Sequence, residues 1–334
     1  MSTSKPQLVI TIDVEPDRQW DDEPVLCLEN LVRLPRLNAL LDDLGARPTY
    51  LVTYTVCADR ACAAMLSGFA HANRCEVGAH LHPWDTPPFL PGDREGGPKP
   101  FPTELEPHLL RAKLQKLTDA LGERVGVRPR AYRAGRWGLD GVGLGLLEEM
   151  GYRTDSSVTP LASWAHQRGR REGSRGPCFK TAPTEPYYPD HEDVSRPGGS
   201  SVLETPVSVG FRARVLERFR SWYQRTPDSA LALRVAKRWP LRLVWFRPTF
   251  SSARTMISLG ERLLAAGAPV LNMAFHSSEA LPGGSPYFRT EAQVNAFFRR
   301  IERTVAHFLK SGMEPATLSE VRPPRMVEKG STRW

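Results

Sequence analysis

The chain has 334 residues, of which 40% are hydrophobic and 25% charged, and its net charge at pH 7 is +8. These values are typical of a soluble globular protein with one large or two ordinary domains. The five cysteines are scattered without a CxxC pair, which argues against a disulfide framework and against a cysteine zinc site. The amino-terminal apolar run LVITI is too short for a secretory signal or a membrane span, so we expect a cytoplasmic protein.

Apolar runs rich in β-branched and aromatic residues alternate with apolar residues at helical spacing along most of the chain. In chain order, the patterns predict a strand at 7–12, a helix at 35–44, a strand at 49–56, a helix at 58–72, a strand at 75–80, a helix at 104–121, a strand at 130–135, a helix at 139–151, strands at 152–157, 201–209 and 268–276, and a helix at 290–312. This alternation favours parallel strands joined by helical crossovers, in an open sheet or a barrel.

Polar, Pro- and Gly-rich stretches interrupt the series but mark no second domain. We expect one domain over residues 1–323, with loop insertions at 86–103 and 163–200 and a disordered tail at 324–334. Loops of that length at a barrel mouth commonly select the substrate.

A basic, aromatic segment lies at residues 212–247, with ten Arg or Lys against two acids. Its cations fit a solvated helical face, or a docking surface for a phosphorylated or membrane-bound substrate. No nucleic-acid recognition motif accompanies the charge, so we expect no specific nucleic-acid partner.

Polar side chains follow four of the predicted strands at the points where the strands end. In barrels of parallel strands, reactive groups gather at these carboxyl ends because all of them open on one face. The residues are Asp13 and Glu15 after the first strand, His80 and His82 after the third, Arg133 on the fourth, and His276 with Glu279 after the last.

The two acids and the two histidines are each separated by one residue, so strand alternation places each pair on one face. Two neighbouring carboxylates need a cation or a shared proton. Two neutral imidazoles and a carboxylate form a common catalytic zinc set that keeps a position open. Alone, an Asp after a strand is usually a turn residue or a helix cap, and a histidine pair can belong to a core.

With these residues in place, the sequence resembles the NodB-homology polysaccharide deacetylases, a group of metal-dependent carbohydrate esterases. The stretches TIDVEPD, EVGAHLHPW, YRAGRWG and LNMAFHSSE resemble four motifs of that family, in family order, over residues 7–310. The resemblance is nearest to the deacetylase-like branch found near cell-wall and exopolysaccharide genes. Two departures stand out: Val14 separates carboxylates that are usually adjacent, and the histidines are two residues apart instead of four.

The resemblance implies a distorted (β/α)7 barrel and a role for each motif residue. Glu15, His80 and His82 would hold a divalent metal, zinc or alternatively cobalt, and Asp85 or a water would replace His82 if His82 does not reach it. Asp13 would be the catalytic base. The remaining roles are assigned to Arg133, which would orient that base, to His276, which would protonate the leaving amine, and to Trp84, Trp137, Glu279 and Tyr287, which would bind the substrate.

The activity implied by the resemblance is metal-dependent removal of an acetyl group from an N-acetylated sugar of polysaccharide or cell-wall metabolism. Because we expect a cytoplasmic protein, a lipid-linked or nucleotide-linked sugar fits better than a finished polymer, with peripheral contact to the inner membrane face through residues 212–247. The alternatives are a catalytically inactive carbohydrate-binding protein on the same scaffold and a different metal-dependent amidohydrolase.

Overall fold

The computed structural model describes residues 5–21, 26–93, 96–226 and 243–323 of the chain. The basic, aromatic segment is therefore described only at 212–226 and 243–247, and the tail at 324–334 lies outside the described residues. None of the helices in the described ranges is long and apolar enough to cross a membrane.

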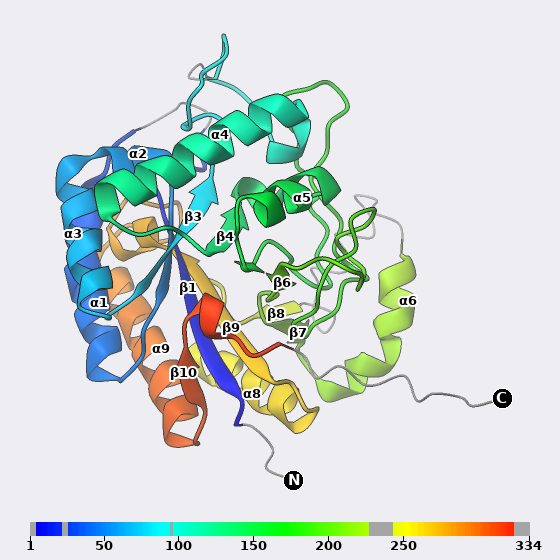
Figure 1. Cartoon of the computed structure of the whole chain (residues 1–334). Coiled ribbons are helices and arrows are strands. Elements are labelled where there is room, and N and C mark those ends of the chain that lie inside the picture. The colour runs from blue at the N-terminus through cyan, green and yellow to red at the C-terminus, as the bar shows by residue number, and fades with distance from the viewer. Residues whose placement is uncertain (1–4, 22–25, 94–95, 227–242, 324–334) are drawn as a thin grey trace, which may run out of the picture.

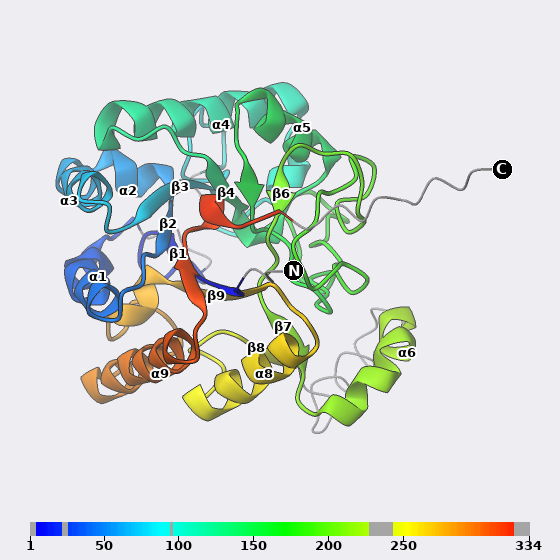
Figure 2. The ribbon, with the colours of Figure 1, turned by 60° about the horizontal axis from the view of Figure 1, so that its bottom comes forward.

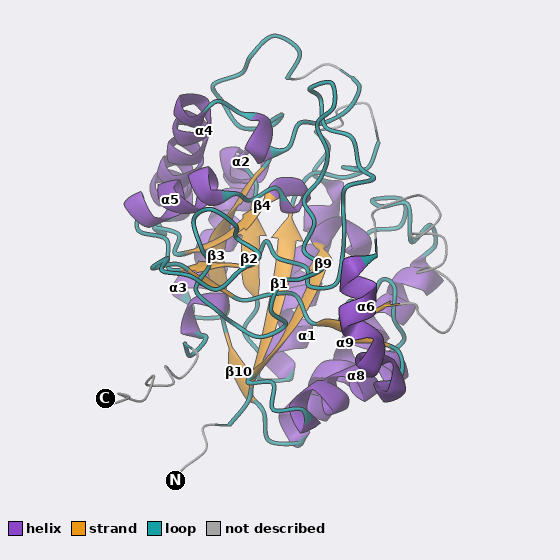
Figure 3. Ribbon diagram, turned by 90° about the vertical axis from the view of Figure 1, so that its right-hand side faces the viewer, coloured by secondary structure: helices purple, strands orange, loops and turns teal. Residues whose placement is uncertain are grey.

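Parallel strands at the centre of the molecule curl into an incomplete barrel (Figures 1 and 3). In spatial order, the seven strands are β9 (Val270–His276), β1 (Gln7–Val14), β2 (Thr49–Val52), β3 (Glu76–Leu81), β4 (Ala131–Ala134), β5 (Thr154–Asp155) and β6 (Leu203–Glu204). A short eighth strand, β10 (Glu314–Ala316), pairs with the first residues of β1.

An antiparallel pair, β7 (Val209–Phe211) with β8 (Leu243–Trp245), lies next to β9 and narrows the gap between β6 and β9. The backbone N–H of Ser208 donates to the Asn272 carbonyl at 3.1 Å, and that of Ala274 donates to the Phe246 carbonyl at 3.3 Å. These two bonds satisfy backbone groups of β9 that would otherwise form an open sheet edge.

Helices surround the curled sheet, and Figure 2 shows them as a ring outside the strands. The ring consists of α1 (Leu34–Asp43), α2 (Tyr54–Ala58), α3 (Arg60–His71), α4 (Pro107–Ala120), α5 (Gly141–Glu149), α8 (Ala253–Ala265) and α9 (Glu291–Lys310). Helix α6 (Arg220–Arg225) lies outside this ring. Because helices cover the outer face and the interior is filled, all eight residues of β1 are buried.

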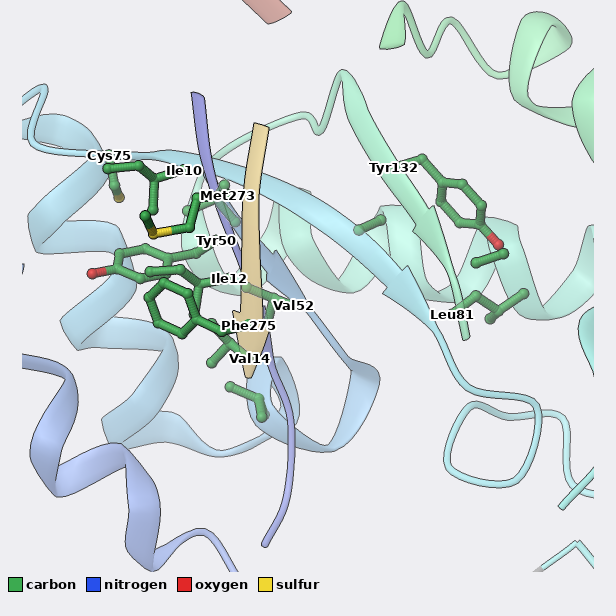
Figure 4. Packing of buried hydrophobic residues seen from close by; sticks show 14 of the residues in the cluster. Ile10, Ile12, Val14, Tyr50, Val52, Cys75, Leu81, Tyr132, Met273 and Phe275 are labelled. Carbon is green, nitrogen blue, oxygen red and sulfur yellow. The ribbon is translucent and has the colours of Figure 1, made fainter. Parts of the chain in front are cut away.

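The outward face of β1 packs beneath the helices. Ile10, Ile12 and Val14 belong to the main hydrophobic cluster, and Figure 4 shows them beside Tyr50 and Phe275 of the flanking strands. Removing such apolar surface from water stabilises the fold by about 25 cal/mol for each Å². The packing therefore fixes which face of β1 points inward.

The inward face of β1 changes from apolar to charged along the strand. Val9 packs in a small interior cluster with Leu51, and the next residue on this face, Thr11, accepts a hydrogen bond from Arg133 at 2.7 Å. Asp13 follows and is also buried. The barrel interior is therefore closed below by apolar packing and lined with polar groups at its carboxyl-terminal end.

Several predicted elements differ from the structure. The strand predicted at 49–56 ends at Val52, and Tyr54–Ala58 forms α2 instead. The strand predicted at 201–209 is divided between β6 and β7, while β8, β10 and α8 have no predicted counterpart. In the first case the β-branched and aromatic residues that favour a strand also form a helical turn packed against α3, because tertiary contacts outweigh strand propensity.

A buried carboxyl pair at the ends of β5 and β6 should make stability depend on pH. Burial and the neighbouring Asp155 raise the pKa of Glu204 well above its ordinary value of 4.5. The folded protein therefore keeps a proton that the unfolded chain loses above about pH 4.5, and stability falls as the pH rises through that value. We expect Glu204→Gln to raise Tm by about 2 °C at neutral pH and by less at pH 4, measured by calorimetry.

Glu123→Gln, at an exposed position, is the charge-matched control for this substitution. An equal change in Tm at both pH values for Glu204→Gln would contradict the explanation that Glu204 keeps its proton in the folded protein.

Candidate metal centre and active site

Strand register brings the polar strand ends together. Asp13 is aligned with His276 across the β1–β9 pair, and His80 is aligned with Arg133 across the β3–β4 pair. Glu15 and His82 each come directly after the last residue of the strand that carries Asp13 or His80. Because the strands are parallel, these side chains meet at one end of the barrel, as predicted from the sequence.

Glu15, His80 and His82 form a buried group suited to a metal ion, with ligand atoms within 4.8 Å of one another. The Nε2 atoms of His80 and His82 lie 3.0 Å apart. Glu15 Oε2 lies 3.5 Å from His82 Nε2 and 3.8 Å from His80 Nε2. His82 therefore reaches the group despite the altered spacing of the histidines. Asp85 is not part of it.

Hydrogen bonding around this group fits a divalent cation. The Nδ1–H of His80 donates to the Arg133 carbonyl at 2.9 Å, which leaves its Nε2 lone pair facing the group. Glu15 Oε1 is buried and has no hydrogen-bond partner among the described residues. A buried carboxylate oxygen without a partner is costly, and a cation at this position would satisfy it.

Electrostatics support the same conclusion. Burial and the adjacent Asp13 raise the pKa of Glu15 to about 8, although His276 opposes the shift. Burial also lowers the pKa of His80 and lowers that of His82 well below its ordinary value. Neutral imidazoles are the form that binds metal, and a bound cation would favour the ionised form of Glu15.

Asp13 is held as a carboxylate by Arg133. Burial alone would raise the pKa of Asp13, but the Arg133 guanidinium, His80 and His276 together lower it to about 2. Arg133 Nη1 donates to Asp13 Oδ1 at 2.6 Å, and its remaining N–H groups donate to Thr11 and Ser156. All of these contacts are buried, so Asp13 is an ionised proton acceptor in a fixed orientation.

His276 lies with one ring nitrogen beside Asp13 and Glu15 and the other beside Glu279. Its Nε2 is 3.5 Å from Asp13 Oδ2 and 3.9 Å from Glu15 Oε1, and its Nδ1 is 3.0 Å from Glu279 Oε1. Burial alone would lower the pKa of His276, but Glu15, Glu279 and Asp13 raise it. A histidine with a raised pKa can act as a proton donor near neutral pH.

Glu279 does not line the pocket, contrary to the expectation that it binds substrate. It is fully buried and forms an ion pair with Arg247, and the Thr249 hydroxyl donates to it. Arg247 also lies 2.9 Å from His276 Nδ1. This arrangement is not apparent from the sequence, because Arg247 lies in a basic segment whose charges are typical of a protein surface.

A cavity of about 490 Å³ opens over these groups and contains the other three predicted pocket residues. Trp84 stacks on His82 with ring centroids 4.2 Å apart, and Trp137 lies under the Arg133 guanidinium at 5.3 Å. Tyr287 contacts Trp20 edge to face. The lining also includes residues outside the set of predicted site residues: Gln19, Trp20, Asp21, Pro98, Lys99, Ala134, Arg136, Trp164, Gln167, Arg168, Arg247 and Phe250.

The two loop insertions form part of this mouth and are tied together by buried charges. Lys113 is fully buried and donates to Asp93 at 3.0 Å and to the carbonyls of Pro83, Thr86 and Pro88. On the other side, Arg170 pairs with the same aspartate at 3.2 Å. Glu104 accepts from the backbone N–H of Arg170 at 3.0 Å, so the 86–103 and 163–200 loops share one set of contacts.

The close approach of Gly135 to His82 gives a test of the metal group. A Cβ atom at Gly135 would lie 2.6 Å from His82 Cδ2 and 2.5 Å from the Leu81 carbonyl oxygen. We expect Gly135→Ala to displace His82 and to weaken zinc affinity about tenfold or more, measured by titration against a competing chelator.

Gly145→Ala is the matched control, because nothing lies within 4 Å of a Cβ at that helical position. Unchanged zinc affinity in a folded Gly135→Ala protein would mean that His82 does not bind the metal.

No protein-family model and no curated protein sequence matches the chain. Among solved structures, a Parabacteroides distasonis protein assigned as a glycoside hydrolase or deacetylase is similar over 95% of this chain and 70% of that one, with a TM-score of 0.58 and 13% identity. A Mycobacterium smegmatis protein assigned as a polysaccharide deacetylase is similar over 97% of both chains (TM-score 0.48, 18% identity). A family 4 acetyl xylan esterase from Clostridium thermocellum, in complex with a cobalt ion, is similar over 94% of this chain and 89% of that one (TM-score 0.43, 10% identity).

The chain therefore shares its fold with the Parabacteroides distasonis protein, and its seven parallel strands form the distorted α/β barrel that was predicted from the motifs. At this level of identity, what is shared is the fold. Since one fold can carry many activities, the chemistry has to be argued from the site.

Proposed function

We propose that this protein is a metal-dependent hydrolase that removes an acetyl group from an N-acetylated sugar. The observation that carries the proposal is the buried Glu15, His80 and His82 group next to an ionised Asp13 and to His276. A scaffold that had lost catalysis would be expected to lose one of these groups, and all of them are present in one cavity. An amidohydrolase of the lysine-bridged kind is less well supported, because no lysine lies at the strand ends that form the site.

Each residue has a role that follows from its contacts. A divalent metal held by Glu15, His80 and His82 would lower the pKa of a coordinated water and polarise the acetyl carbonyl. Asp13, fixed by Arg133, takes up a proton from the attacking water. His276 donates a proton to the nitrogen of the departing amine, so that the products are acetate and a free amino sugar.

The aromatic lining of the cavity supports a sugar as substrate. Trp20, Trp84, Trp137, Trp164 and Tyr287 line the cavity with aromatic rings on which a sugar ring can pack. We propose zinc as the metal, with cobalt as a substitute.

We also propose a cytoplasmic location and a lipid-linked or nucleotide-linked sugar of polysaccharide or cell-wall metabolism as the substrate. The exposed Phe219 and Trp222, close to the exposed Arg218 and Arg225, are the described part of the surface that would contact a membrane.

Substitution of the proposed base tests the reaction. We expect Asp13→Asn to lower acetate release by about 100-fold or more while the protein still binds about one zinc per chain, because Asp13 is outside the metal group. The measurements are acetate release from N-acetylated sugars and metal analysis of the purified protein. Asp119→Asn, at an exposed position on α4, is the control.

Full activity in Asp13→Asn would disprove its assignment as base. A wild-type protein that retains sugar binding but releases no acetate with any added metal would favour the inactive carbohydrate-binding alternative.

Substitution of Glu279 tests the proposed acid. The Glu279 carboxylate raises the pKa of His276, so Glu279→Gln should lower it. Because His276 must be protonated to donate, the alkaline limb of the kcat/KM profile should then move to lower pH. Thr249→Ser, which keeps the hydroxyl that donates to Glu279, is the control. A lower kcat with an unshifted profile would leave Glu279 with a purely structural role.

A further inference from the structure

Three cations form a cluster on one part of the cavity wall: Lys99, Arg136 and Arg168. The Arg136 guanidinium donates to the backbone carbonyls of Lys99 and of Arg168, the latter at 2.9 Å, so it lies between the other two residues. The three come from different segments, namely the two loop insertions and the turn after β4. The fold therefore brings together three segments that are distant in sequence and that each carry a cation into the cavity lining.

Other charges of the cavity have partners inside the protein. Asp13 pairs with Arg133, Arg247 pairs with Glu279, and Asp21 lies 3.8 Å from Arg18. Glu15 belongs to the candidate metal group.

By contrast, neither Arg136 nor Arg168 forms an ion pair with a described acid. The acid that acts on the pKa of Arg136 is Glu104, whose oxygens accept from Ser174 and from the backbone of Arg170 and Arg171. Buried or half-buried charges are normally paired, so an arginine that donates only to uncharged groups can accommodate an anion from outside.

The backbone that carries Arg136 is held in an unfavourable conformation. Arg136 and Trp137 both have positive φ, +54° and +63°, which costs energy for residues with a side chain. This turn directs Arg136 onto the Phe101 ring, 3.8 Å from its centroid, and sets Trp137 against Arg133. Strain of this kind persists where the surroundings over-determine it, commonly at ligand-binding sites.

We propose that Lys99, Arg136 and Arg168 bind an anionic group on the substrate, next to the sugar ring that carries the acetyl group. The proposal rests on the proposed function and adds to it that the preferred substrate is an acidic N-acetylated sugar. Oxygen atoms of a phosphate ester or of a carboxylate supply the same chemistry, because guanidinium groups bind both. The sugar ring packs on the aromatic wall while its anionic substituent lies against the cationic cluster.

Binding can be measured apart from turnover in the Asp13→Asn protein, by calorimetry with and without added zinc. The probes are N-acetylglucosamine, N-acetylglucosamine 1-phosphate and N-acetylmuramic acid, which present no anion, a phosphate and a carboxylate. We expect at least one acidic sugar to bind about tenfold more tightly than the neutral one. Raising the salt from about 0.05 M to about 0.5 M should remove most of the difference.

The preference should depend on the cluster. Because Arg168 is exposed and its side chain has no ion pair with a described residue, Arg168→Gln should fold normally. We expect it to reduce the ratio of acidic to neutral affinity about fivefold, and Lys99→Gln combined with it to abolish the preference. Arg175→Gln removes the same charge from an exposed position of the same loop, outside the cavity lining, and should leave the ratio unchanged.

Equal affinity for all three sugars, or a ratio that Arg168→Gln does not change, would overturn the proposal. A preference that occurs only with zinc present would assign the anion to the metal and would also overturn it. The two proposals fail separately: acetate release without acidic preference contradicts only the cationic subsite, and acidic preference without acetate release contradicts only the hydrolase. Comparison of the two acidic probes identifies the anion as phosphate or carboxylate.

Discussion

The structure depends on the burial of two carboxyl groups, Asp13 and Glu15, at the carboxyl end of the first strand. Two such groups repel each other in a medium of low polarity and cannot both be ionised without cations close by. Arg133 supplies one cation, through a hydrogen bond to Asp13 that is itself enclosed by the barrel. Glu15 has no arginine partner among the described residues: burial lowers the pKa of the two histidines of its own group, and His276 lies 3.9 Å away without forming a hydrogen bond to it. The difference between the two acids defines their chemistry: one is an ionised base and the other a ligand in need of a metal.

The rest of the barrel places these charges and keeps water from most of them. Apolar side chains fill the lower interior, a polar layer that includes Thr11 and Asn272 lies above it, and the reactive groups come last. The arginine that fixes Asp13 crosses from β4 to β1 through this polar layer. An open sheet would leave Arg133 partly hydrated and the base less well oriented, so the curvature of the sheet is part of the chemistry.

The main features of the fold and the site were predictable from sequence because they depend on local periodicity. Two residues separated by one position share a strand face wherever the strand lies, which is why Asp13 with Glu15 and His80 with His82 could be paired in advance. Parallel strands then bring those ends together without further information. The role of Glu279 could not be predicted, because it depends on a tertiary contact with Arg247, 32 positions away in the chain. The contacts of Arg136 could not be predicted either, because a sequence motif does not show which backbone carbonyls accept hydrogen bonds from its guanidinium.

The shared contacts of the two loop insertions bear on how substrate preference can change in such a barrel. Asp93 of one loop binds both Lys113 of the scaffold and Arg170 of the other loop, and Glu104 accepts hydrogen bonds from that second loop as well. Exchanging the first insertion alone would leave the buried Lys113 ammonium without its aspartate, and exchanging the second alone would leave Glu104 without the hydrogen-bond donors of that loop. Grafting experiments and natural recombination should therefore succeed only when both segments are transferred as a pair.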